Sequence, residues 1–166
     1  MPDPYSDIDP ELLASMKERF RATPLHALLG LDIREPDPTD DELSVVDMAV
    51  TPQAFGSTGN LHGGAIATLC DVACASAAAR NPAFKPGLNA LVTADLHVRY
   101  LGRPKGDHVR AEARVVKAGR TLLVVEGRVL DDEDRVIATA DFAAMIVDLR
   151  EPLRPELATD DAAAEM

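Results

Sequence analysis

The sequence contains no tryptophan, and only 4% of its residues are aromatic, so its core must be built mainly from Ala, Val and Leu. It also lacks a long uninterrupted apolar run. The longest apolar stretch, Gly63 to Ala79, contains Thr68, Asp71 and Ser76, and it predicts a buried helix rather than a membrane span. The acidic start has no apolar segment of the kind found in signal peptides, so we expect a cytoplasmic protein.

Cysteine is scarce, and its placement limits the roles it can have. Cys70 and Cys74 lie one helical turn apart, where the geometry of a disulfide fits poorly. We interpret both as small buried hydrophobes in a reducing compartment. With four histidines and no further cysteine, the pattern gives little support to a metal site, and we expect no metal and no cofactor.

Positive charge is in short supply, because 17 Lys and Arg residues stand against 28 Asp and Glu residues, a formal net charge of −11. Nonspecific nucleic-acid binding needs a basic face, so this class of function is excluded. An anionic substrate would need a local basic patch to overcome the acidic field.

The length of 166 residues fits one domain with a real core. Hydrophobic periodicity and turn residues predict an α+β order of two short helical segments, two strands, one long helix and an antiparallel meander. The expected helices are 10–20, 24–30 and 62–80, and the expected strands are 31–35, 42–51, 93–100, 108–116, 121–130 and 135–147.

The meander carries the clearest alternation. In the strand 93–100, alternation places Ala94, Leu96, Val98 and Tyr100 toward the core. The run Lys117-Ala118-Gly119-Arg120 is typical of a tight hairpin turn. A single helix can cover only one face of the resulting sheet.

The most informative segment is the turn His62-Gly63-Gly64, which opens the apolar helix, together with Asp71 inside it. A carboxylate is rarely placed among apolar residues unless it is paired or used. A glycine pair lets a ligand approach the unpaired N–H groups of a helix start. Two structural alternatives stay open. Asp71 can be a structural residue that pairs with an arginine, and the role of the glycines can be limited to close helix packing.

These residues resemble a known family. His62-Gly63-Gly64 followed by Leu69-x-Asp71, the strand 93–101 and the hairpin 117–120 are similar to hotdog-fold thioesterases, of the phenylacetate-pathway type within the 4-hydroxybenzoyl-CoA thioesterase superfamily. The resemblance covers roughly Leu28 to Val147. It implies a hotdog fold, an antiparallel sheet of about five to six strands wrapped around one long central helix. We therefore expect this domain at 28–150, an N-terminal tail with a short helix at 1–27 and a disordered tail at 151–166.

The resemblance also implies roles for three residues. Asp71 would activate water or attack the thioester directly, the backbone N–H of Gly63 would donate to the oxyanion, and Thr93 would assist from the following strand. The family commonly carries Asn or Gln six residues before the histidine, and this chain has Gly56 there. Gln53, or Asn60 from the same loop, is the nearest substitute.

Contacts to an acyl-CoA substrate are expected from two places. His62, Gly64 and Asn60 surround the helix start. The alternative for His62 is that it only holds the loop through hydrogen bonds. Lys117 and Arg120 are the basic residues that we expect near the phosphates of coenzyme A, against the alternative that they are ordinary solvated side chains.

Spacing predicts an assembly. Eight helical residues separate Gly63 from Asp71, about 12 Å at 1.5 Å per residue, so one chain cannot bring both to one thioester carbon. Two antiparallel copies of the helix across a two-fold axis can. We expect a homodimer with two composite sites, or a homotetramer built as a dimer of dimers, and no nucleic-acid or membrane partner.

The leading functional hypothesis is an acyl-CoA thioesterase that releases a free carboxylic acid and CoA. The alternative is a noncatalytic acyl-CoA binding or sensing module on the same fold, which the glycine at residue 56 favours. A hotdog hydratase ranks last, because His62 and Asp71 have the wrong spacing for its paired acid and base. The aliphatic composition favours an aliphatic or small acyl group.

Overall fold

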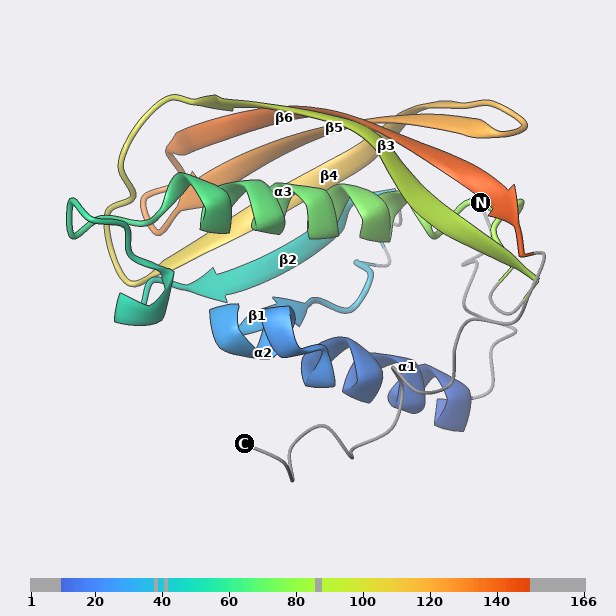
Figure 1. Ribbon diagram of the computed structural model, residues 1–166, viewed down its shortest axis with the longest axis horizontal. Coiled ribbons are helices and arrows are strands. Elements are labelled where there is room, and N and C mark those ends of the chain that lie inside the picture. Colours follow the sequence, from blue (N-terminus) through green and yellow to red (C-terminus); the bar gives the residue numbers. More distant parts are fainter. Residues whose placement is uncertain (1–9, 38, 41, 86–87, 150–166) are drawn as a thin grey trace.

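The computed structural model describes residues 10–37, 39–40, 42–85 and 88–149, and in it a six-stranded antiparallel sheet curls around one long helix (Figure 1). The strand order across the sheet is β1-β2-β4-β5-β6-β3. The strands are β1 (Leu31–Ile33), β2 (Ser44–Ala49), β3 (Asn89–Tyr100), β4 (His108–Ala118), β5 (Leu122–Asp131) and β6 (Val136–Asp148). The expected hotdog architecture is confirmed.

The central helix α3 (Gly63–Ala78) crosses the concave side of the sheet (Figure 1). His62 caps its start. The helix ends at Ala78 with Ala79 as its C-cap, shortly before the Asn81-Pro82 pair. Gly127 in β5 permits close packing, because a Cβ there would lie 3.0 Å from Cys74 Sγ. The expected helix over 62–80 is therefore confirmed to within two residues at each end.

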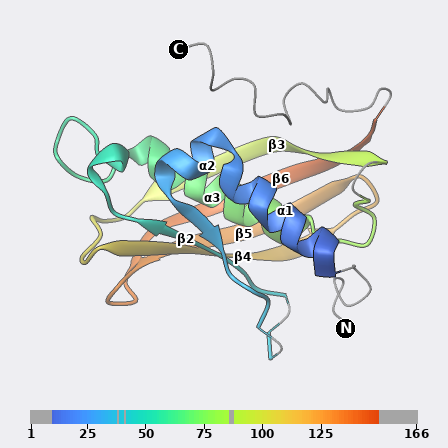
Figure 2. The same cartoon turned by 90° about the horizontal axis from the view of Figure 1, so that it is seen from below.

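The N-terminal segment forms helices α1 (Pro10–Ala22) and α2 (Pro24–Leu29), which pack beside β1 and the 3-10 turn η1 (Pro52–Ala54) (Figure 2). Gly30 ends α2 in the left-handed conformation, at φ 62°, where glycine carries no steric penalty. Both helices were expected. The expected tail at 151–166 and the first nine residues lie outside the described part of the chain, and the proposed domain boundaries stay predictions.

A β-bulge in β3 changes which residues face α3. The register with β6 runs from Thr93 opposite Ala144 directly to Asp95 opposite Ala143, so Ala94 is the extra residue. Thr93 thereby joins Leu96 and Val98 on the helix side of the sheet, although unbroken alternation would place it on the other side. The prediction that Ala94 faces the core was wrong, since Ala94 is exposed.

The expected hairpin after β4 is shorter than the sequence indicated. Lys117 and Ala118 still belong to β4, after a bulge at Val116, and the connection is made by residues 119–121. The Gly119 N–H closes the turn on the Leu122 carbonyl at 2.8 Å. The bulge lets the strand continue, which a simple alternating pattern does not reveal.

The connection between β5 and β6 is organised by a buried carboxylate, Asp131, which is 1% exposed. Its two oxygens accept hydrogen bonds from the backbone N–H groups of Lys105, Glu133 and Arg135 and from the Arg135 guanidinium. Burial raises the pKa of Asp131, but these hydrogen bonds outweigh it and hold the pKa well below its ordinary value. Asp131 therefore acts as a structural anchor.

Candidate functional site

One stripe of α3 is left partly uncovered by the rest of the chain. Ala67, Thr68, Asp71 and Ala75 are half-buried, whereas Leu69, Cys70, Ala73 and Cys74 on the opposite side are buried. The spacing of these four residues follows one helical face. Asp71 is thus the carboxylate that α3 presents at its open side.

Asp71 has one hydrogen-bond partner among the described residues. The Thr93 hydroxyl donates to Asp71 Oδ1 at 3.0 Å, which the bulge in β3 makes possible. No arginine or lysine is paired with Asp71 in this part of the chain. The carboxylate therefore keeps most of its acceptor capacity for other groups, and the alternative of a structural ion pair loses its support.

The start of α3 is held on both sides of Gly63. His62 Nδ1 accepts a hydrogen bond from the Gly64 N–H at 2.8 Å, so the neutral imidazole carries its proton on Nε2. Tyr100 Oη donates to the Gly63 carbonyl at 3.0 Å. Gly63 itself is the first helical residue, whose N–H has no acceptor within the helix.

The loop before α3 packs closely around Gly56. A Cβ at Gly56 would lie 3.0 Å from His62 Cδ2, so a larger side chain there requires the imidazole to move. The Gly56 N–H donates to the Asn60 carbonyl at 2.7 Å, and the Asn60 side chain donates to the Thr58 carbonyl at 3.0 Å. Asn60 is thus used to shape its own loop, while Gln53 is exposed.

The two candidate groups lie at different places along α3. Gly63 contacts β3 at Tyr100, and Asp71 contacts the same strand at Thr93, seven residues earlier, because β3 runs antiparallel to the helix. The helical rise alone separates them by about 12 Å. The structure therefore does not bring Gly63 and Asp71 of one chain to a common point.

The candidate phosphate contacts are remote from both groups within one chain. Lys117 lies near the end of β4 and Arg120 in the turn that follows, and both are exposed. Two strands, β5 and β6, separate β4 from β3, which carries Thr93. Neither basic side chain has an ion-pair partner among the described residues.

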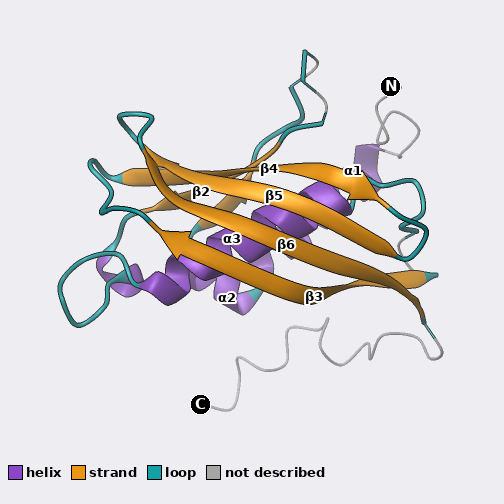
Figure 3. Cartoon of the chain, turned by 90° about the horizontal axis from the view of Figure 1, so that it is seen from above, coloured by secondary structure: helices purple, strands orange, loops and turns teal. Residues whose placement is uncertain are grey.

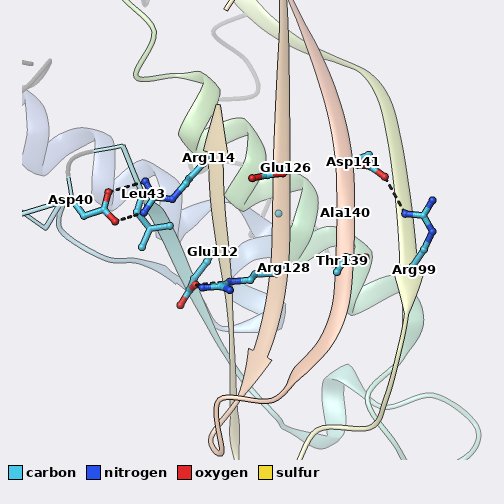
Figure 4. Close-up of a pocket in the computed structure, with 11 residues that line it drawn as sticks. Asp40, Leu43, Arg99, Glu112, Arg114, Glu126, Arg128, Thr139, Ala140 and Asp141 are labelled. Atoms are coloured by element: carbon cyan, nitrogen blue, oxygen red, sulfur yellow. Dashed lines mark hydrogen bonds and ion pairs between the residues drawn. The ribbon is translucent and has the colours of Figure 1, made fainter. Parts of the chain in front are cut away.

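Figure 3 shows the face of the sheet away from α3, and this face carries a groove of about 740 Å³ (Figure 4). Its arginines pair with carboxylates, namely Arg114 with Asp40, Arg128 with Glu112 and Arg99 with Asp141. Charge in the groove is therefore largely neutralised, apart from the exposed Glu126, which has no hydrogen-bond or ion-pair partner among the described residues. The groove lies on the opposite side of the sheet from the candidate site.

Neither a membrane span nor a metal cluster is found in the described ranges. No helix there is both long and apolar enough to cross a bilayer. No set of three or more His, Cys, Asp or Glu side chains gathers closely enough there to hold a metal ion.

Both cysteines are free and buried. Burial, together with the nearby charge of Asp71, raises the pKa of the Cys70 thiol to about 12. Burial likewise raises the pKa of Cys74. Since the thiolate is the reactive form, neither residue is suited to act as a nucleophile at neutral pH.

Comparison with known proteins agrees with this fold. Residues 58–138, which include the helix start, Asp71 and Thr93, match the model of the thioesterase superfamily. The chain has the hotdog fold of the thioesterase superfamily. The protein VNG_1336C of Halobacterium salinarum, which is named as an esterase, is 41% identical to this chain over 76 residues, or 46% of this chain. That alignment spans only about half of the relative, 49% of its length.

Solved structures extend the likeness over most of the chain. A thioesterase family protein from Silicibacter pomeroyi is 28% identical, with a TM-score of 0.70, over 82% of this chain and 98% of that one. BH2602 from Bacillus halodurans, solved with CoA, is 27% identical, with a TM-score of 0.66, over 82% of this chain and 83% of that one. The thioesterase PA1618 from Pseudomonas aeruginosa, in a variant form, shares the fold at 24% identity and a TM-score of 0.72, over 85% and 95%. The finer phenylacetate-pathway type stays a prediction.

Sequence reasoning missed one residue at the helix start, Tyr100. Its inward orientation was predicted from alternation, and its partner across β6 is the buried Ala138. It is nevertheless 53% exposed, so it does not belong to the core. The available signal was its hydroxyl, because a tyrosine on the inner face of a strand needs a hydrogen-bond partner.

Proposed function

We propose that this protein is an acyl-CoA thioesterase, which hydrolyses a CoA thioester to a carboxylic acid and CoA. The observation that carries the proposal is the state of Asp71. It lies on the open face of α3, is half-buried, and accepts one hydrogen bond, from Thr93. A carboxylate with free acceptor capacity beside apolar side chains is suited to activate an oxygen nucleophile.

Asp71 supports two routes for the acyl transfer. As general base, it would take a proton from a water molecule that attacks the thioester carbon. As nucleophile, its oxygen would attack the carbon itself, the C–S bond would break with CoA leaving as the thiolate, and water would then hydrolyse the resulting anhydride to the free acid and the carboxylate of Asp71. Thr93 would fix the carboxylate in either case, since its hydroxyl occupies one lone pair of Oδ1 and leaves the other oxygen available.

The Gly63 N–H is the group that we propose for stabilising the oxyanion. It lies at the first position of α3, where the helix dipole favours negative charge. The neighbouring Gly64 N–H is already engaged by His62 Nδ1, which leaves Gly63 as the donor of the pair. We propose that His62, Gly64 and Asn60 act on the substrate through the shape of this loop.

A second copy of the chain would complete the site. The 12-residue strand β3 is at the edge of the sheet, and an unpaired edge of that length favours pairing with another strand. The small residues Ala67 and Ala75 on the open stripe of α3 would let a second helix approach closely. In a two-fold arrangement, Gly63 of one copy would face Asp71 of the other.

A similar structure solved with CoA supports an acyl-CoA ligand. Lys117 and Arg120, which have no ion-pair partner in the described part of the chain, are the proposed phosphate contacts. We propose a homodimer, or a homotetramer built from two such dimers, in the cytoplasm. An aliphatic or small acyl group is proposed because aromatic residues are few.

A panel of acyl-CoAs, from acetyl to long-chain and aryl thioesters, tests the proposal by the release of free thiol. We expect hydrolysis of at least one member by the native protein, fastest for aliphatic or small acyl groups. The buried cysteines should not react with the thiol reagent in the folded protein. No thiol release from any member would refute the proposal.

The alternative of a noncatalytic acyl-CoA binding module is favoured by Gly56, which leaves no amide side chain to orient water or the thioester. Titration calorimetry followed by recovery of the ligand distinguishes the two functions. A binding module would return the acyl-CoA intact after saturation, whereas an esterase would return the acid and CoA.

A further inference from the structure

Tyr100, which alternation along the strand places toward the core, lies instead at the start of α3. Tyr100 ends β3, and its hydroxyl donates to the Gly63 carbonyl at 3.0 Å. Its ring atoms Cε1 and Cζ lie 3.5 Å from the position that a Cβ on Gly63 would occupy. The ring therefore covers Gly63 on one side while about half of the residue stays exposed.

Two hydrogen bonds hold the peptide unit between Gly63 and Gly64 from opposite ends. Its carbonyl oxygen accepts from Tyr100, and its N–H donates to His62 Nδ1. The peptide unit before it, between His62 and Gly63, is held by the hydrogen bond from the Ile66 N–H to the His62 carbonyl at 3.2 Å. The backbone on both sides of the Gly63 Cα is thus fixed.

This restraint has a physical reason. Two consecutive glycines have more backbone freedom than any other pair, and they occupy the first turn of the helix, whose N–H groups have no intrahelical partner. An oxyanion donor contributes most when its N–H is already aimed and needs no rearrangement. A group that further restrains the backbone at Gly63 therefore favours the use of its N–H as such a donor.

We propose that Tyr100 is a positioning residue, which fixes the orientation of the Gly63 N–H through the Gly63–Gly64 peptide. This role rests on the proposed function, because the N–H is positioned for the thioester oxygen. Tyr100 does not exchange a proton with the substrate. Its hydroxyl acts through the backbone of the helix start.

The variant Tyr100→Phe tests the role, because it deletes the hydroxyl and keeps the ring. In the full-length protein, we expect faster hydrogen exchange of the Gly64 amide by NMR, since that N–H shares the released peptide. We also expect kcat to fall by about tenfold with KM unchanged, as for the loss of one hydrogen bond made to aim a donor. Thr139→Val, which removes a hydroxyl from the groove on the opposite side of the sheet, should change neither quantity.

The two readouts separate failure of this inference from failure of the proposed function. Unchanged Gly64 exchange in Tyr100→Phe would overturn the inference whatever the turnover. Faster exchange with unchanged turnover would also overturn it, because the peptide would then be held without effect on catalysis. Faster exchange in a protein that hydrolyses no acyl-CoA would refute the thioesterase and leave the restraint of the helix start by Tyr100 in place.

Discussion

Two aspartates in this molecule are both withdrawn from solvent, to different degrees, and differ in how their hydrogen-bonding capacity is used. Asp131 is 1% exposed and accepts from three backbone N–H groups and from Arg135. Asp71 is half-buried and accepts from Thr93 alone among the described residues. The first carboxylate is saturated by the fold, and the second is left available.

The difference shows which observation indicates a functional acid. Burial alone would select Asp131, whose loss of water is more complete. Buried polar groups are normally satisfied, as Asp131 is by the turn between β5 and β6. The half-buried carboxylate of Asp71 instead keeps acceptor capacity at an open face, which is what the proposed chemistry uses.

The largest expected effect comes from Asp71→Asn, which keeps the shape of the side chain and removes its charge. We expect kcat to fall at least about 100-fold, since neither general-base nor nucleophilic attack is possible without the carboxylate. The melting temperature should stay within about 2 °C of the native value, because the Thr93 hydrogen bond can persist. A variant that keeps its turnover would refute the assignment of Asp71.

Asp131→Asn should give the opposite pattern. The amide can no longer accept all of the hydrogen bonds that the carboxylate accepts, so we expect the melting temperature to fall by roughly 5 °C or more. Turnover per folded molecule should stay near the native value. Thermal unfolding and kinetics measured on one preparation check both statements, and a loss of kcat without a loss of stability would contradict them.

The native protein and Asp131→Asn should also differ in how their thermal stability changes at acidic pH. The folded-state pKa of Asp131 lies below its ordinary value, so its contribution to stability is present above the unfolded-state pKa, about 3.9. That contribution is lost as the pH falls through the folded-state pKa. Melting temperatures between about pH 5 and 2 should therefore fall more steeply for the native protein than for Asp131→Asn. Parallel curves would show that Asp131 does not carry this linkage.

A smaller effect is expected from Thr93→Val, which removes the one hydrogen bond to Asp71. We expect kcat to fall by about tenfold, because the carboxylate becomes free to rotate away from the attacking geometry. Thr93→Ser should restore most of the rate, since it returns the hydroxyl. Equal losses in both variants would show that packing of the methyl group, rather than the hydrogen bond, is responsible.

The smallest effects are expected at the exposed cations. Lys117→Ala and Arg120→Ala should each raise KM for an acyl-CoA by about threefold and leave kcat unchanged, as is usual for one exposed charge contact. The increase should shrink at high salt, because screening already weakens the contact in the native protein. Glu126→Gln, on the face away from α3, is the matched control and should leave KM unchanged.

Much of the fold could be predicted from sequence because periodicity and turn residues report local structure directly. The helix from His62 is marked by a nearly all-apolar stretch that ends before Asn81-Pro82, and the strand His108–Val116 by apolar residues at every second position. The inner face of β3 could not be fully predicted, because a one-residue bulge at Ala94 leaves no mark in the pattern. Thr93 was singled out by resemblance alone, and the bulge supplies the physical reason that it reaches Asp71.

The candidate site was predictable only in part. The His62-Gly63-Gly64 turn and Asp71 are visible as a polar interruption of an apolar helix, and resemblance gave them roles. The Tyr100 hydrogen bond joins residues 37 positions apart in the chain, and nothing local in the sequence indicates that contact. The packing of His62 on Gly56 depends equally on the loop conformation.

The central claim is that the site combines Gly63 of one chain with Asp71 of another, and subunit mixing tests it most directly. Asp71→Asn removes the acid. Gly63→Pro removes the N–H at the first helical position, where proline is well tolerated.

The two variants are co-expressed with separate tags. Each heterodimer would then carry one doubly altered site and one intact site. At random pairing, the mixture should recover about a quarter of the native kcat, although each variant alone is nearly inactive. No recovery in isolated heterodimers, or full activity of a monomer in analytical ultracentrifugation, would contradict the composite site.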